Sequence, residues 1–297
     1  MTLPGRLTAG AGRRIVTAIP FFWLALFFLA PFFIVFGISL SQSRFGIPPY
    51  EPLISNGAIA ARLDNYAALL DDPLYVKALF SSLRIAAASS AICLLIGYPI
   101  ALGIARAPRR WRSPLLLAVI LPFWTSFLIR VYAWMGLLKS DGIVNGAMLA
   151  LGLIDQPVQL MQTAFAVHLG IVYSYLPFMV LPLYASLERQ DISLLEAASD
   201  LGARPFRAFF TITLPLSLPG AVAGCLLVFI PAVGEFVIPE LLGSSGTLMI
   251  GKVLWTEFFN NRDWPLASAL AVAILALIVA PLAWLEHTRL KRAEAGR

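Results

Sequence analysis

Residues 193–215 read SLLEAASDLGARPFRAFFTITLP and form a polar interval between two long apolar stretches of the chain. Ser193 and Glu196 have the spacing of a capping box, in which each side chain satisfies a backbone N–H that the first turn of a helix leaves open. Gly202 follows at the distance where a left-handed glycine ends a helix. The interval therefore predicts a sharply bounded helix of roughly eight residues and about 12 Å, held outside the bilayer, whose small alanines let another protein surface approach closely.

The composition places the rest of the chain in a membrane. Of the 297 residues, 59% are hydrophobic and 13% are charged, and the mean hydropathy is +0.82. These values are typical of an integral membrane protein. Segments long enough to cross roughly 30 Å of hydrocarbon are predicted at Ile19–Leu40, Leu79–Ile104, Pro114–Leu138, Thr163–Leu187, Phe209–Pro231 and Pro265–Leu285. The predicted fold class is thus an all-α integral membrane protein with about six transmembrane helices.

The distribution of Lys and Arg orients these spans. The N-terminus, the interval around Arg106–Arg112, the interval around Arg189–Arg207 and the C-terminal tail together hold 14 of the 22 basic residues. Because positive charge accumulates in cytoplasmic segments, both termini and the helix at 193–202 are predicted to be cytoplasmic, where ATP is available. The net charge of +6 therefore orients the chain, and no basic patch with exposed aromatic residues points to nucleic acid.

The two long outer intervals differ in character. Residues 41–78 are polar and rich in proline, as expected of a solvated loop. The interval from Pro231 to Trp264 is mostly apolar but is interrupted by Gly and Pro, and such backbone is tolerated at membrane depth only where protein or a wet cavity surrounds it. We interpret this interval as the mouth of a pathway. Glu235, an acid among apolar neighbours, must be paired, hydrated or neutral there.

The sequence offers no convincing catalytic or metal-binding site. Gly246–Lys252 has the spacing of a phosphate-binding loop, but Val253 replaces the Ser or Thr that would hold magnesium and no strand precedes the loop. His168 and His287 are too far apart to form a metal cluster. The two cysteines lie inside predicted spans, where thiols act as small apolar side chains. We therefore expect no catalytic residue, no metal and no disulfide.

The polar interval resembles a known motif. Glu196-Ala197-Ala198, Gly202 and the closing Ile212-Thr213-Leu214-Pro215 are spaced as in the EAA loop of permease subunits of bacterial ABC importers of the first type. The resemblance covers roughly Tyr75 to His287. Further stretches resemble putrescine and spermidine permeases in particular: Pro122–Trp134, Tyr175–Tyr184, Ile230–Gly243 and Trp255–Pro265.

This resemblance implies a function and a set of partners. The chain would be one permease of an ATP-driven importer that moves putrescine or spermidine from the periplasm to the cytoplasm across the bacterial inner membrane. Its partners would be a second permease, a cytoplasmic ATPase dimer that holds ATP and magnesium, a periplasmic polyamine-binding protein and membrane lipid. The chain itself would be no enzyme and hold no cofactor. Residues 1–74 would form the cytoplasmic N-terminus, first span and outer loop, residues 75–287 the permease domain, and residues 288–297 a basic cytoplasmic tail.

The resemblance also assigns roles to residues. Glu196, Ala197, Ala198 and Gly202 would couple the chain to the ATPase, because the EAA helix of the family lies in a groove of that partner. Candidate residues of the substrate pathway are Glu235, Glu240, Trp124, Tyr132 and Trp134.

Structural roles compete with some of these assignments. The aromatic residues are equally suited to an interfacial belt. Glu235 is suited to gating or structural pairing as well as to contact with a passing cation. Arg130, in the same stretch as the aromatic residues, is expected to be a structural charge paired within the helix bundle.

Two other functions are compatible with a multi-span chain. One is an ABC importer permease for another small solute, such as a sugar, phosphate or iron. The other is a stand-alone secondary carrier, which usually shows an internal repeat and coupling-ion sites at broken helices. We find no convincing repeat of the spans, and a carrier has no need of an EAA loop.

Overall fold

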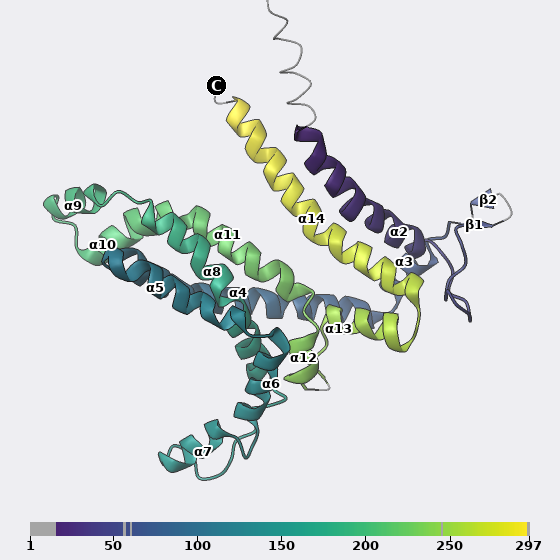
Figure 1. The fold of residues 1–297 in the computed structure, drawn as a ribbon, viewed down its shortest axis with the longest axis horizontal. Helices are drawn as coiled ribbons and strands as arrows, with labels where there is room; N and C mark the ends of the chain where they lie inside the picture. Colours follow the sequence, from purple (N-terminus) through teal and green to yellow (C-terminus); the bar gives the residue numbers. More distant parts are fainter. Residues whose placement is uncertain (1–15, 56–57, 60, 245, 296–297) are drawn as a thin grey trace, which may run out of the picture. The chain divides into compact units, whose positions relative to one another are not determined.

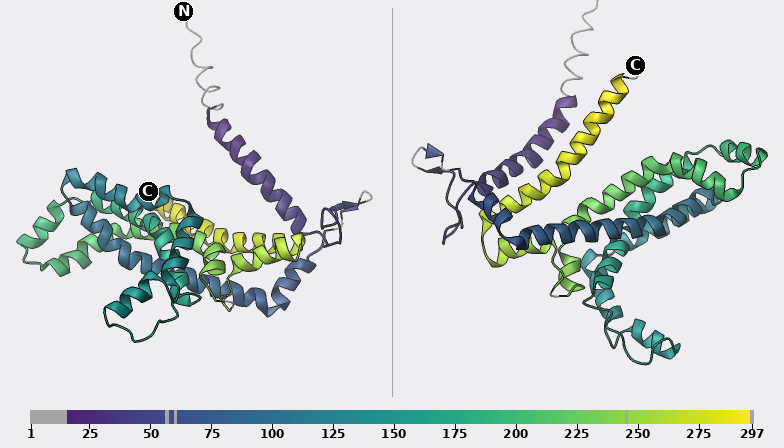
Figure 2. Two further views of the ribbon diagram at one scale, coloured as in Figure 1. Left: turned by 60° about the horizontal axis from the view of Figure 1, so that its bottom comes forward. Right: turned by 180° about the vertical axis from the view of Figure 1, so that it is seen from behind.

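The computed structural model describes residues 16–55, 58–59, 61–244 and 246–295, and these residues are predominantly helical. Among them, five helices are long and apolar enough to cross a membrane, and a sharply bent pair raises the number of candidate spans to six. The chain divides into two compact units (Figures 1 and 2). One unit combines Met1–Pro73 with Leu254–Arg297, and the other is Leu74–Val253.

The first unit is built on the first and last spans. It contains the span Val16–Ser39 and the elements η1 (Ala25–Leu29), α2 (Ala30–Ser39), β1 (Ile54–Ser55), β2 (Ala58–Ile59), α3 (Asp64–Asp71), η4 (Thr256–Asn260) and α14 (Trp264–Ala295). In Figure 1, α2 and α14 lie side by side, and they are in contact. The Ser39 and Tyr66 hydroxyl oxygens are 2.7 Å apart, which ties α3 to the end of α2. Part of the interval predicted as a loop is therefore an ordered hairpin and helix.

The second unit contains the remaining spans and the polar interval. Its elements are α4 (Pro73–Arg106), α5 (Arg109–Ile120), η2 (Leu121–Trp124), α6 (Phe127–Leu138), α7 (Ile143–Ala150), α8 (Ala164–Glu188), α9 (Ser193–Asp200), α10 (Pro205–Ala208), η3 (Phe209–Thr213), α11 (Leu214–Val233), α12 (Val237–Leu241) and α13 (Ile250–Trp255). The fifth predicted span is a continuous helical run from Pro205 to Val233.

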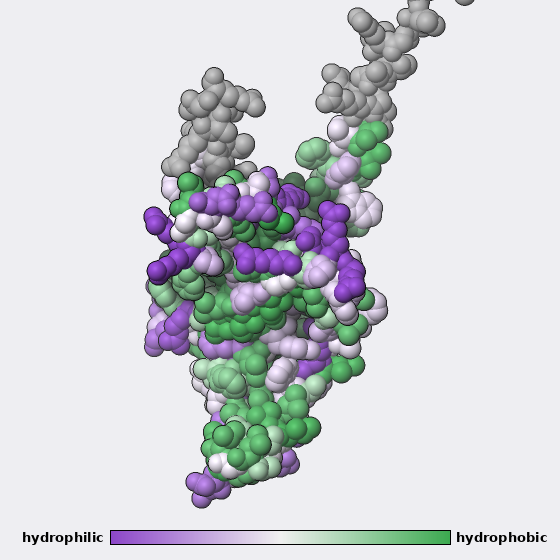
Figure 3. Space-filling model, turned by 90° about the vertical axis from the view of Figure 1, so that its left-hand side faces the viewer, coloured by the Kyte–Doolittle hydropathy of each residue, from purple (hydrophilic) through white to green (hydrophobic). Residues whose placement is uncertain are grey.

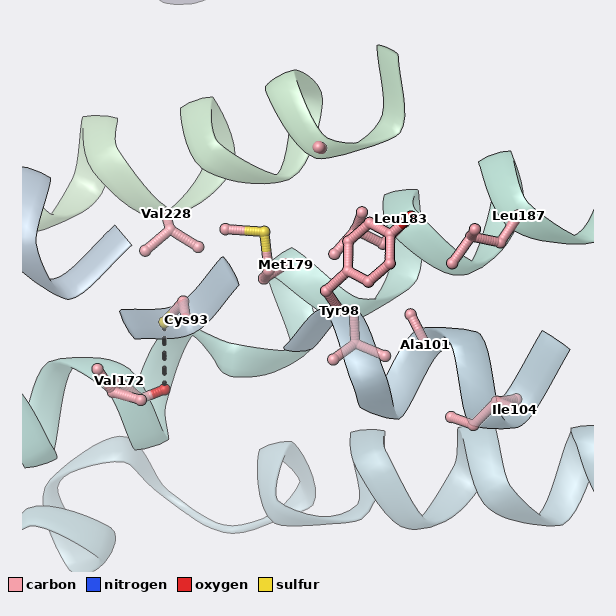
Figure 4. Close-up of a cluster of buried hydrophobic side chains, with 11 residues drawn as sticks. Cys93, Tyr98, Ala101, Ile104, Val172, Met179, Leu183, Leu187 and Val228 are labelled. Atoms are coloured by element: carbon pink, nitrogen blue, oxygen red, sulfur yellow. Dashed lines mark hydrogen bonds between the residues drawn. The ribbon is translucent and has the colours of Figure 1, made fainter. Parts of the chain in front are cut away.

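Close packing of α8 against α11 forms the centre of this unit (Figure 2). A Cβ atom added to Gly224 would lie 2.7 Å from Met179 Sδ and 3.1 Å from the Met179 carbonyl oxygen, so only glycine allows the two helices to approach this closely. Met179, Cys93 and Val228 are fully buried in the cluster drawn in Figure 4. The Cys93 thiol donates to the Val172 carbonyl oxygen at 3.7 Å, as suits a thiol used as a small core side chain.

Five predicted spans are confirmed as long apolar helices, but the third is not one continuous helix. Between Trp124 and Phe127 the helix axis turns by 88°. Pro122 lacks a backbone N–H, and the Thr125 hydroxyl donates to the Pro122 carbonyl oxygen at 2.8 Å, where a helix would instead continue its backbone ladder. Thr125 and Ser126 are extended, with ψ of 152° and 139°. The third predicted span, Pro114–Leu138, is therefore a bent pair of helices that counts as the sixth candidate span.

Candidate functional site

The polar interval forms a short helix, but its first turn is not capped as predicted. The helix α9 begins at Ser193, and no side chain caps it from the preceding residue. The Ser193 N–H instead donates to Asp191 Oδ1 at 3.0 Å. The predicted reciprocal bonds between Ser193 and Glu196 are therefore wrong, because Ser193 already lies inside the helix and Asp191 serves its amide. Glu196 is exposed and its carboxylate is available to another surface.

Asp191 was missed as a cap, although an Asp two residues before a predicted helix is a known signal for a local turn. Its bond to the Ser193 amide holds the pKa of the Asp191 carboxyl below its ordinary value. The carboxylate is the form that accepts this bond, so the turn is favoured when Asp191 is ionised.

The opposite end of α9 is closed as the sequence predicts. Gly202 has a φ of +79°. Its N–H donates to the Ser199 carbonyl oxygen and the Ala203 N–H donates to the Ala198 carbonyl oxygen, both at 2.9 Å. These two bonds form a Schellman motif, which requires the left-handed conformation that glycine adopts at little cost. The prediction that Gly202 ends the helix is confirmed.

Large apolar side chains are exposed beside α9. Leu201 is 88% exposed and Phe206 is 77% exposed, on either side of the turn that follows α9. Ala197 is exposed, whereas Ala198 is buried and faces the rest of the unit. Figure 3 is seen from the side on which Figure 1 labels α9, and it shows hydrophilic side chains lying among apolar ones. Contiguous exposed apolar residues rimmed by polar ones mark protein interaction surfaces.

The second candidate site is the segment that folds back after α11. The helix ends at Val233, residues 234–236 are not helical, and the short helices α12 and α13 follow. A Cβ atom on Gly170 would lie 2.8 Å from Leu242 Cδ1 and 2.9 Å from Ile238 Cγ2, so α12 packs tightly on α8. The Ile250 N–H donates to Ser82 Oγ at 2.8 Å, which fixes the start of α13 on α4.

Glu235 lies at the turn of this segment and is 7% exposed. Its Oε2 accepts from the Tyr175 hydroxyl at 2.5 Å. Its Oε1 accepts from the Val237 N–H at 3.1 Å and the Ile238 N–H at 3.4 Å, which satisfies amides at the start of α12. The carboxylate is thus bonded on both oxygens and ties α8 to α12. Tyr175, which comes 60 positions before Glu235, was missed as its partner because no spacing in the sequence pairs the two.

Glu240 has a different environment on α12. It is exposed, and its Oε2 lies 2.9 Å from Lys252 Nζ on α13. The exposed fractions of the Lys252 and Glu240 side chains are 28% and 52%. Lys252 was missed as the partner of Glu240, because no spacing in the sequence pairs the two.

The aromatic candidates are spread over the bent third span. Trp134 is partly buried, and its ring contacts the Tyr173 ring edge to face, with centroids 5.4 Å apart. Trp124 is 74% exposed and Tyr132 is 56% exposed. No hydrogen bond or ring contact among the described residues joins these three side chains to Glu235.

Arg130 is not paired as predicted. It is 9% exposed, and its Nε and Nη1 atoms have no hydrogen-bond partner among the described residues. Its guanidinium lies over the rings of Phe123, at 4.9 Å, and Phe127, at 5.7 Å. These cation–π contacts hold the two sides of the helix break together, so Arg130 is a structural charge that aromatic faces stabilise in place of an acid.

The chain is predominantly helical, presents a short, exposed helix in the interval between two spans, and has an acidic, partly non-helical segment after α11. These features are typical of a transport permease. A family model described as the binding-protein-dependent transport system inner membrane component matches residues 4–287. The chain therefore belongs to this family.

Individual proteins that resemble this chain include two permeases and one solved transporter structure. The chain is 41% identical over 266 residues to the spermidine/putrescine transport system permease protein PotB of Haemophilus influenzae, a match that covers 90% of each protein. It is 42% identical over 252 residues to PotB of Escherichia coli, covering 85% of this chain and 88% of PotB. A bacterial ABC transporter involved in the import of alginate has a similar fold, with a TM-score of 0.70 and 17% identity over 96% of this chain and 99% of that one.

Proposed function

We propose that this chain is a permease subunit of an ATP-driven importer that moves putrescine or spermidine from the periplasm into the cytoplasm. The observation that carries the proposal is the 41% identity to a spermidine/putrescine permease over 90% of both proteins. The helix α9 supports the proposal. It is exposed and has hydrogen bonds that fix both of its ends, and a rigid helix at the end of a span can transmit a partner's movement to that span.

The partners follow from the same proposal. A second permease completes the pathway, a cytoplasmic ATPase dimer binds ATP and magnesium and docks on α9, and a periplasmic protein delivers the polyamine. The chain lies in the inner membrane with both termini in the cytoplasm, and it hydrolyses nothing itself. Exposed Glu196 and Ala197 and the apolar side chains beside them are the surface that the ATPase contacts.

The substrate pathway runs past the segment that folds back after α11. A polyamine carries several ammonium groups separated by methylene chains, so carboxylates and aromatic faces are the groups that suit it. Glu235, Glu240, Trp124, Tyr132 and Trp134 are the residues to which we assign this contact. Moderate contacts lower the cost of desolvating the cation and still allow its release.

Uptake by the reconstituted complex tests this function. The two permeases, the ATPase and the binding protein are placed in proteoliposomes, and entry of labelled putrescine, spermidine and a sugar is measured with and without ATP. ATP-dependent entry of a polyamine but not of the sugar is expected. ATP-dependent entry of the sugar without entry of a polyamine indicates an importer for another solute. Uptake driven by an ion gradient without ATP indicates a secondary carrier.

Variants in the same assay test the pathway residues. Glu235→Gln keeps the shape of the side chain but removes its charge, and Trp134→Ala removes an aromatic face. Both are expected to slow polyamine uptake more than they reduce the yield of assembled complex. If Glu235→Gln assembles normally and transports putrescine at the parent rate, Glu235 does not contact the cation and keeps only its bonds to Tyr175 and α12.

A further inference from the structure

Two acids in the segment that folds back differ in how easily an incoming cation can reach them. Glu235 is buried, and three protein donors already occupy its two oxygens. Removing one of these donors leaves part of the hydrogen-bonding capacity of a buried charge unsatisfied, which is costly. Glu240 instead pairs with the Lys252 ammonium, and both side chains of this pair are partly exposed. Exchange of one cation for another is therefore easier at Glu240 than at Glu235.

The group that occupies Glu240 is chemically close to the proposed cargo. A lysine side chain is an ammonium on a flexible stem of four carbons. Putrescine has the same ammonium and the same four-carbon stem, with a second ammonium at the far end, and spermidine contains that aminobutyl unit. Lys252 Nζ, 2.9 Å from Glu240 Oε2, thus occupies the position that a polyamine ammonium would take.

From this geometry we infer that Lys252 is an internal substitute for the substrate, which a polyamine displaces from Glu240 as it passes. The inference rests on the proposed function and adds a specificity-determining residue to it. Displacement leaves the Lys252 ammonium beside the bound polyamine, where repulsion between like charges favours release of the substrate. Return of Lys252 to Glu240 then restores the starting arrangement.

The helices that carry the pair are held firmly, so the exchange needs movement of side chains only. Ile238 on α12 and Leu242, which directly follows this helix, pack against Gly170. On α13, a Cβ atom on Gly251 would collide with the Gly234 carbonyl oxygen, and the Ile250 amide is bonded to Ser82. Both backbones therefore stay in place while the Lys252 stem, with its rotatable bonds, leaves and returns.

The signs of two changes in KM test the exchange. In the reconstituted complex, Lys252→Met removes the competitor of the substrate, so the KM for putrescine uptake is expected to fall, by up to about fivefold, the factor that matches an exposed ion pair. The maximal rate is expected to fall as well, because the substrate is no longer driven off. Glu240→Gln removes the acceptor and is expected to raise the KM. Lys252→Arg keeps a competing cation and is expected to leave the KM at or above the parent value.

A merely structural ion pair gives a different pattern. Both Lys252→Met and Glu240→Gln would then break the same contact, so their KM values would move in the same direction and the yield of assembled complex would fall equally for both. That result overturns the exchange while polyamine uptake by the parent still stands. If the parent complex takes up no polyamine, the proposed function is wrong and the exchange is withdrawn with it. Lys252→Gln, which keeps a polar side chain, repeats the test if Lys252→Met fails to assemble.

Discussion

Replacing Gly202 by valine is expected to weaken binding of the ATPase partner through the backbone alone. Gly202 has a φ of +79°, and a Cβ atom there meets no other atom within 4 Å, so the new side chain has space but the wrong backbone preference. A left-handed residue other than glycine costs roughly 1–2 kcal/mol. The end of α9 is in equilibrium between a form that keeps the Schellman motif at Gly202 and a form that has lost it. The cost of the substitution shifts this equilibrium by about 5- to 30-fold toward the form without the motif.

The assay is capture of the purified ATPase by the tagged permease pair, with polyamine uptake measured on the same preparations. Gly202→Val is expected to lower the affinity for the ATPase and the uptake rate by a factor that does not exceed the shift in this equilibrium. Gly202→Asn is expected to behave nearly as the parent does, because asparagine tolerates the left-handed region.

The chain contains a matched control at Gly152. It has a φ of +66°, and a Cβ atom there also meets nothing within 4 Å. Its N–H and that of Leu153 bond back to Leu149 and Met148, at 3.0 and 2.9 Å, so it ends α7 with the same motif as Gly202. Gly152→Val carries the same backbone cost. Gly152 lies in the interval between the third and fourth predicted spans, on the side of the membrane opposite to the predicted cytoplasmic segments. Equal loss of ATPase binding in the two valine variants, or normal binding and uptake in Gly202→Val, would refute the coupling role of Gly202.

Three further predictions concern topology, the cap of α9 and the bond between Tyr175 and Glu235. Single cysteines near Arg109 or Arg204 are expected to react only from the cytoplasm, and those near Asn56 or Asn261 with an impermeant reagent added outside; labelling at 204 in intact cells would reverse the orientation. Because its folded pKa is lowered, the Asp191 cap is expected to persist above the ordinary value of 3.8 and to be lost as the pH falls through that lowered pKa. The Ser193 amide shift should follow this titration in the parent protein but not in Asp191→Asn. Tyr175→Phe leaves one oxygen of buried Glu235 without its donor, which costs about 1.5–3 kcal/mol. The Tm of the complex should fall in Tyr175→Phe and stay nearly unchanged in Tyr173→Phe; equal shifts would contradict the role of this bond.

The amino-acid sequence determined the features that arise locally. Long apolar runs specify helices in a membrane because backbone polar groups must be satisfied within each span, and five of the predicted spans are long helices. Gly202 was predictable because one left-handed residue is enough to end a helix. The family motif in residues 193–215 was equally readable, since its residues lie close together along the chain.

Only the tertiary structure decided the features that depend on distant partners. The break in the third span lies at a local bond between the Thr125 hydroxyl and the Pro122 carbonyl oxygen, but the burial of Arg130, whose cation–π contacts hold the bend, depends on the folded chain. The carboxylate of Glu235 accepts a hydrogen bond from Tyr175, 60 positions away in the sequence, because α8 places that hydroxyl beside it. The pairing of Lys252 with Glu240 likewise requires α12 and α13 to be fixed on α8 and α4. Hydrophobic pattern and turn chemistry specify where helices begin and end, whereas the partner of a charge depends on which surfaces those helices bury against one another.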